Sequence, residues 1–123
     1  MIQPTKLIKS FGYALEGLAH AWKFDQNLRI HVLIAVIVLL LAYFLQVPFI
    51  EVIILSVLII LVITTEMINT AIENMVDLIT SEHRQEAKIA KDVSSGMVFI
   101  AAVGSLVVGL LIFLPYIFKL ITQ

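Results

Sequence analysis

The chain has 123 residues, of which 61% are hydrophobic and 14% are charged, and its mean hydropathy is +1.07. Such a composition is too apolar for a soluble globular domain, so the sequence predicts a single integral membrane domain, residues 1–123. The net charge of −1 argues against a nucleic-acid partner, which requires a basic surface. Because cysteine is absent, disulfides, cysteine zinc sites and thiol catalysis are excluded.

The first segment, residues 5–24, predicts an amphipathic helix. Its large apolar side chains recur at helical spacing at Leu7, Phe11, Leu15, Leu18 and Trp22. Lysines fall at other positions, and an interfacial tryptophan with lysines suits the headgroup layer, so we expect this helix to lie on the membrane surface. A helix packed flat against its own bundle would show the same pattern, and that alternative stays open.

Three apolar segments follow, at about residues 30–47, 51–73 and 93–118. Each is long enough to cross the roughly 30 Å hydrocarbon core of a bilayer as a helix. A turn at residues 46–49 separates the first two, and the second becomes polar at its end. The sequence therefore predicts an all-α membrane protein with a surface helix and three transmembrane helices.

The distribution of lysine and arginine predicts the orientation. Seven of the eight basic residues precede the first span or lie between the second and third spans, and only Lys119 follows the third. By the positive-inside rule the N-terminus and the second loop lie in the cytoplasm, and the C-terminus lies outside.

The second span ends in a row of polar side chains that share one helix face. The row consists of Glu66, Asn69, Thr70, Glu73 and Asp77. A charged side chain at the centre of a membrane helix costs about 2.5 to 3.5 kcal/mol on insertion scales, so such residues usually indicate a functional site. For Asp77, a solvated position at the entry to the loop is an equally good interpretation.

The second loop, residues 81–92, carries both signs of charge, and Lys88, Lys91 and Asp92 have the spacing of one helix face. Carboxylates can hold a divalent cation and lysine can neutralise phosphate, and phosphoryl transfer needs both. Neither a P-loop nor a G-x-G-x-x-G sequence is present. The three histidines are far apart in the sequence, which favours interfacial or hydrogen-bonded roles over metal binding.

The row at residues 66–77, EMINTAIENMVD, followed by Ala90-Lys91-Asp92, resembles the prokaryotic diacylglycerol kinase and undecaprenol kinase family. The matching pattern is E-x-x-N-[ST]-A-I-E-x-x-V-D with A-K-D further along the chain, and the resemblance extends over the whole sequence. It implies a homotrimeric enzyme of the bacterial cell membrane, with ATP as co-substrate, Mg²⁺ as cofactor and active sites between subunits near the cytoplasmic interface.

The resemblance also implies roles for individual residues. Glu66 is similar to the catalytic base, and Glu73 with Asp25 to the metal ligands, although the family usually has a glutamate where Asp25 stands. The implied ATP-binding residues are Tyr13, Asp25, Glu73, Glu82, Arg84, Lys91 and Asp92. The implied substrate-binding or site-organising residues are Lys6, Trp22, Asn69 and Asp77.

These features favour an ATP- and Mg²⁺-dependent kinase that phosphorylates a membrane lipid alcohol. Residues 27–31 and 109–115 resemble the Gram-positive branch, whose members tend to be undecaprenol kinases, so undecaprenol is the favoured substrate and diacylglycerol the alternative. A small ion-coupled transporter or channel subunit is a remote alternative, because the other spans offer no charged residues to extend a path. A non-catalytic scaffold could use the small residues Ala101, Ser105 and Gly109, but would leave the carboxylates unexplained.

Overall fold

A computed structural model describes all 123 residues. The chain forms four helices and no strands: α1 (Pro4–Phe24), α2 (Gln26–Phe44), α3 (Phe49–Ile79) and α4 (Gln85–Ile121). The last three are long and apolar enough to cross a membrane. The predicted all-α class is therefore confirmed, and the three predicted spans correspond to three candidate membrane-spanning helices.

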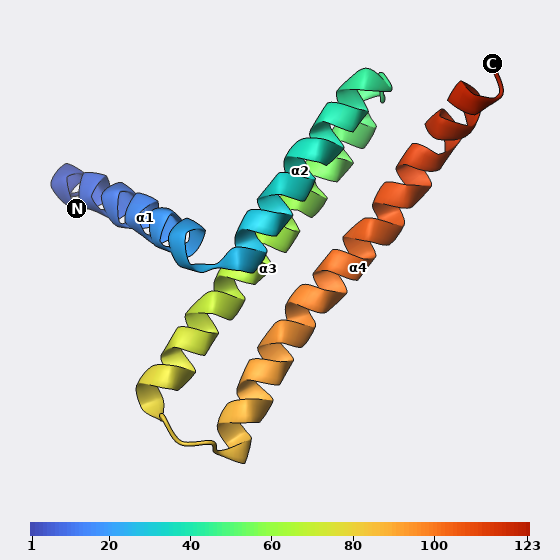
Figure 1. Ribbon diagram of the computed structural model, residues 1–123. Helices are drawn as coiled ribbons and strands as arrows, with labels where there is room; N and C mark the ends of the chain where they lie inside the picture. Colours follow the sequence, from blue (N-terminus) through green and yellow to red (C-terminus); the bar gives the residue numbers. More distant parts are fainter.

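Helices α2, α3 and α4 run alongside one another, whereas α1 projects from the start of α2 away from the other three (Figure 1). A single non-helical residue, Asp25, separates α1 from α2. Ala21 is the only buried residue of α1. The predicted helix at residues 5–24 thus corresponds to α1, and its placement on a membrane surface stays a prediction.

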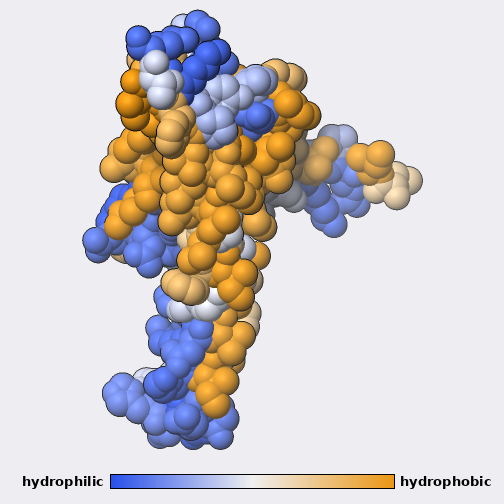
Figure 2. All heavy atoms as spheres, turned by 90° about the vertical axis from the view of Figure 1, so that its right-hand side faces the viewer, coloured by the Kyte–Doolittle hydropathy of each residue, from blue (hydrophilic) through white to orange (hydrophobic).

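The three spans differ in length. Helix α2 has 19 residues, α3 has 31 and α4 has 37, which correspond to about 28, 46 and 55 Å at 1.5 Å per residue. Only α2 matches the hydrocarbon thickness, and α3 and α4 continue beyond its start towards the loop that joins them (Figure 1). Figure 2 shows apolar side chains around the middle of the bundle and hydrophilic ones at its two ends.

The charged segment at residues 81–92 differs from the prediction. Only residues 80–84 are non-helical, and α4 already begins at Gln85. Glu86 stands in the first turn of α4, where a negative charge interacts favourably with the helix dipole, and Ala87 and Lys88 are good helix formers. The predicted loop is therefore wrong for residues 85–92, which extend the third span as a helix.

The end of the bundle opposite this loop is closed by a small apolar cluster. Ala42, Val47, Leu55 and Phe113 are buried together. The turn between α2 and α3 passes through Gln46, whose φ of 52° is left-handed. Most other large apolar side chains are exposed, as expected for helices whose solvent is lipid.

Candidate active site

The polar row on α3 becomes steadily more exposed towards the loop. Glu66 is 2% exposed and Asn69 is 7% exposed, Glu73 is half-buried, and the Asp77 side chain is 63% exposed. Glu66 is thus the most buried carboxylate of the row, and burial of a carboxylate is tolerated only where polar groups surround it.

A polar cavity of about 430 Å³ lies beside this row, and only one of its eleven lining residues is hydrophobic. The lining residues come from all four helices and the α1–α2 junction: His20, Phe24, Asp25, Gln26, Asn27, Glu66, Asn69, Thr70, Glu73, Asn74 and Ser95. Three carboxylates predicted from the sequence, those of Asp25, Glu66 and Glu73, therefore border one space.

The oxygen atoms around this cavity fit the ligand preference of Mg²⁺. The ion commonly takes one or two protein carboxylates and completes its shell with water and substrate phosphates. No group of three or more acidic or histidine side chains forms a metal cage of its own. Asp25 and Glu73 could thus supply the protein carboxylates of a Mg²⁺ site whose remaining ligands are water and substrate phosphates.

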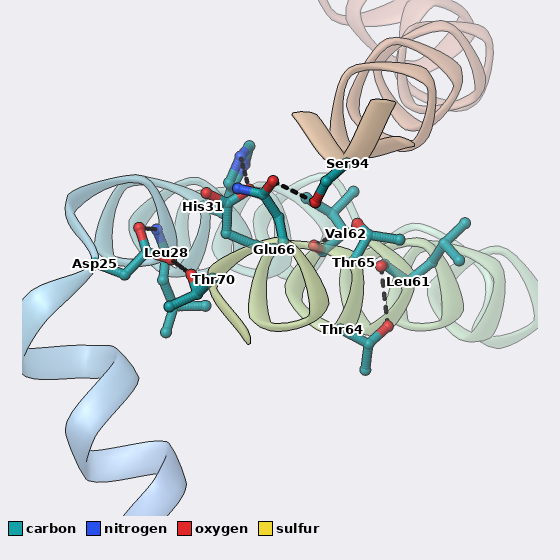
Figure 3. Close-up of polar contacts among 11 residues, drawn as sticks. Asp25, Leu28, His31, Leu61, Val62, Thr64, Thr65, Glu66, Thr70 and Ser94 are labelled. Atoms are coloured by element: carbon teal, nitrogen blue, oxygen red, sulfur yellow. Dashed lines mark hydrogen bonds and ion pairs between the residues drawn. The ribbon is translucent and has the colours of Figure 1, made fainter. Parts of the chain in front are cut away.

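Asp25 connects the α1–α2 junction to α3. Its Oδ1 accepts a hydrogen bond from the Leu28 backbone N–H at 3.1 Å, which caps the start of α2. Its Oδ2 accepts a hydrogen bond from the Thr70 hydroxyl at 2.6 Å (Figure 3). Both carboxylate oxygens are therefore oriented by neighbours, as is usual for residues that ligate metals.

Neighbouring helices contact the α3 row from two sides. His31 of α2 places Nε2 at 4.0 Å from Glu66 Oε2, and Ser94 of α4 donates a buried hydrogen bond to Asn69 Oδ1 at 2.6 Å (Figure 3). The most buried part of the row is thus held between α2 and α4.

A second polar cavity, of about 700 Å³, lies at the loop end of α3 and α4. Five of the predicted site residues line it: Asp77, Glu82, Arg84, Lys91 and Asp92. Lys91 Nζ donates to Asp77 Oδ1 at 2.5 Å, and Arg84 Nε donates to Glu82 Oε2 at 3.1 Å. Apart from Tyr13, the residues predicted to bind ATP are therefore divided between this cavity and the one beside Glu66.

Three predicted residues lie outside both cavities. Lys6, Tyr13 and Trp22 are exposed on α1 and line neither space. The projection of α1 explains this result, because only its last turn reaches the polar cavity, through His20 and Phe24.

A third cavity, of about 460 Å³, lies between α2, α3 and α4, and 14 of its 17 lining residues are hydrophobic. His31 lies on its wall, whereas the carboxylate partner of His31, Glu66, lines the polar cavity. The His31–Glu66 contact therefore stands between an apolar space and a polar one. Ser105 also lines the apolar space, and its hydroxyl is buried without a hydrogen-bond partner.

A comparison with known protein families shows to which family the chain belongs. The family described as prokaryotic diacylglycerol kinase matches residues 12–113. The chain belongs to this family. The family predicted from the sequence motif is thus confirmed, and every predicted site residue except Lys6 lies inside the matched range.

Curated relatives of the family are similar over most of the chain. An undecaprenol kinase of Bacillus subtilis is 40% identical over 90% of this chain and 90% of its own length. A diacylglycerol kinase of Synechocystis is 38% identical over 93% of this chain and 66% of its own length. A diacylglycerol kinase of Escherichia coli is 32% identical over 80% of this chain and 81% of its own length. The predicted enzyme class agrees with these names.

Thr70 was predicted as a member of the polar row without a role of its own, whereas His31 and Ser94 were not predicted as site residues. Thr70 had a signal, because it shares the helix face of the carboxylates, and Ser94 follows Lys91 at a spacing of three. His31 was expected to be interfacial or hydrogen-bonded, and no local spacing relates it to Glu66. Only the packing of α2 against α3 brings these two side chains together.

Proposed function

We propose that the protein is a lipid kinase of the bacterial cell membrane that transfers the γ-phosphoryl group of ATP to the hydroxyl of undecaprenol. The observation that carries this proposal is the position of Glu66, a buried carboxylate in a polar cavity, in contact with a histidine that lines an apolar cavity. A kinase for a lipid alcohol needs such a boundary, because its acceptor is in hydrocarbon and its donor is in water.

In the proposed reaction Glu66 accepts the proton of the lipid hydroxyl as its oxygen bonds to the γ-phosphorus. The bond from that phosphorus to the bridging oxygen breaks, and ADP leaves. Mg²⁺, when bound, neutralises charge on the phosphates. Asp25 and Glu73 would hold the ion, and Asn69, fixed by Ser94, would orient groups beside the base.

The loop-end cavity supports a role for its basic side chains in nucleotide binding. Arg84 and Lys91 line it, and both are suited to bind phosphate. In the single chain each is paired with a carboxylate, Glu82 and Asp77 respectively. We infer that the phosphates of a bound nucleotide replace these carboxylates as partners of Arg84 and Lys91. Before ATP binds, the two ion pairs hold the basic side chains in place.

We further propose a homotrimer with the N-terminus and the α3–α4 loop in the cytoplasm, as the family resemblance and the distribution of lysine and arginine imply. Within one chain Lys6 and Tyr13 are remote from both polar cavities, so an ATP site that uses them requires another subunit. Close helix contacts are favoured by small residues, which α4 has at Ala101, Ser105 and Gly109; within one chain Ala101 is buried, and the other two line the cavity between α2, α3 and α4.

Purified protein in detergent, given labelled ATP and either undecaprenol or diacylglycerol, tests the reaction. We expect phosphate transfer to both lipids, with the higher kcat/KM for undecaprenol, because the undecaprenol kinase of B. subtilis is 40% identical over 90% of each chain. Exclusive transfer to diacylglycerol would support the alternative substrate. The similar proteins of Synechocystis and E. coli are named diacylglycerol kinases. Folded protein that phosphorylates neither lipid would contradict the proposed kinase.

Mixed oligomers test whether a site is shared between subunits. One variant carries Glu66→Gln, and the other carries Lys91→Ala with Asp92→Ala. Each should be inactive alone, and mixing them should recover partial activity if the base and the phosphate-binding residues come from different chains. A mixture that stays inactive at every ratio, while cross-linking still detects trimers, would show that each site is built within one chain.

A further inference from the structure

The angle between α1 and the membrane-spanning helices depends on very few contacts. Only Ala21 of α1 is buried, and the helix is joined to α2 through the single residue Asp25. A helix with so little packing can swing unless hydrogen bonds at the junction hold it. The structure contains two sets of such hydrogen bonds, which meet at this junction.

Asp25 makes the first set. Its backbone N–H donates to Ala21 O at 2.8 Å and so ends α1. Its carboxylate caps α2 at the Leu28 N–H and accepts the hydroxyl of Thr70 at 2.6 Å. One residue thus ends a helix, begins the next and bonds to a third that lies 45 positions along the chain.

Arg29 makes the second set from the first turns of α2. Its Nη1 donates to Trp22 O at 3.1 Å and to Lys23 O at 2.9 Å. These carbonyls belong to the last turn of α1, which has no helical partner for them and carries the negative end of the helix dipole. A guanidinium at this point both satisfies the carbonyls and stabilises the dipole.

We propose that Thr70 and Arg29 are positioning residues that fix α1 relative to the polar cavity. The last turn of α1 contributes His20 and Phe24 to the wall of that cavity, so its angle determines the shape of the space. Thr70 belongs to the same helix face as Glu66 and Glu73. The carboxylate row and the projecting helix are therefore coupled through the bond from Thr70 to Asp25.

Spin labels test this coupling directly, and the absence of native cysteine allows single labels without prior substitution. One label replaces the exposed Glu16 on α1 and a control label replaces the exposed Val107 on α4. In full-length protein in lipid nanodiscs, Thr70→Val removes the hydroxyl at nearly constant shape. We expect greater mobility of the label at position 16, no change at position 107, and recovery of the original spectrum with Thr70→Ser.

Arg29→Met is the companion variant, because it removes the donors and retains a long apolar stem. It should loosen the label at position 16 in the same way. Unchanged mobility at position 16 in both variants would overturn the proposal. Equal loosening at position 107 in both variants would also overturn it, since the contacts would then support the bundle rather than α1.

The kinetic consequence rests on the proposed function, whereas the spectra do not. If the protein is the proposed kinase, Thr70→Val should raise the KM for ATP about fivefold, the size expected for one net hydrogen bond, and Thr70→Ser should restore it. A wild-type protein without kinase activity would contradict the proposed function and leave the spectroscopic test of α1 intact. Loosened labels with an unchanged KM would overturn the coupling of α1 to the nucleotide site.

Discussion

Glu51 and Glu66 are both carboxylates of α3, and their surroundings differ. Glu51, near the α2–α3 turn, accepts a hydrogen bond from the Tyr116 hydroxyl at 2.8 Å, beside the apolar cluster that closes this end. Glu66, towards the loop, borders a polar cavity and has His31 at 4.0 Å. A carboxylate bonded to a hydroxyl and packed in place stabilises the bundle, whereas one that faces a cavity is available to a substrate.

The largest expected difference between these two carboxylates is in turnover. Glu66→Gln should lower kcat at least about 100-fold, because the amide keeps the shape and cannot accept the hydroxyl proton. The KM for ATP and the fold should change little. The matched control is Glu51→Gln, which should retain kcat close to wild type. A Glu66→Gln enzyme with wild-type kcat would show that the base has been assigned wrongly.

The dependence of activity on Mg²⁺ concentration should show whether Asp25 and Glu73 are metal ligands. Asn is as good a helix cap as Asp, so Asp25→Asn should preserve the start of α2 while weakening a Mg²⁺ site. We expect Asp25→Asn and Glu73→Gln each to raise the Mg²⁺ concentration for half-maximal activity about tenfold. Binding of Mn²⁺ in the presence of a non-hydrolysable ATP analogue, followed by electron paramagnetic resonance, provides a readout independent of turnover. An unchanged Mg²⁺ response in Asp25→Asn would remove Asp25 from the metal site and leave it as a cap.

His31 tests whether contact with α2 matters to Glu66. Replacement by leucine removes the polar group of α2 that lies 4.0 Å from the buried carboxylate, and we expect kcat to fall about tenfold. His31→Gln keeps a polar group at a similar position and should retain most activity. Equal kcat values in the leucine and glutamine variants would indicate that the histidine contributes only volume to the apolar cavity.

The smallest expected effect is at Tyr116. Tyr116→Phe removes the hydrogen bond to Glu51 and should lower the free energy of unfolding by about 0.6 kcal/mol, with kcat unchanged. Unfolding in a denaturing detergent series and the lipid kinase assay, made on the same preparation, check both parts. Loss of activity from folded Tyr116→Phe protein would contradict the division of α3 into a structural and a reactive end.

Local spacing predicted much of this architecture. The positions of Glu66, Asn69, Glu73 and Asp77 on one helix face follow from the geometry of a single helix, and the apolar segments follow from composition. The charged residues 85–92 were expected to form a loop, because charge indicates an exit from hydrocarbon and does not distinguish a solvated loop from a helix that continues into water.

Contacts between helices could not be predicted in the same way. Thr70 and Asp25 are 45 residues apart, and Ser94 and Asn69 are 25 apart. Such pairs depend on how far each helix extends past its neighbour, which hydropathy does not specify. The roles assigned to residues at these contacts stay predictions that the variants above are designed to test.

The short length of α2 should make the junction at Asp25 sensitive to the thickness of the bilayer. With 19 residues, α2 spans about 28 Å, and Asp25 at its start is bonded to Thr70 on α3. A thicker membrane must compress around α2 or draw the Asp25 junction towards hydrocarbon, and both responses cost free energy. Helices α3 and α4 can accommodate the same increase in bilayer thickness, because both are longer than the hydrocarbon core is thick. Hydrophobic mismatch would therefore act on the reactive end of α3, and the acyl-chain length of the surrounding lipids would influence the rate of the proposed reaction.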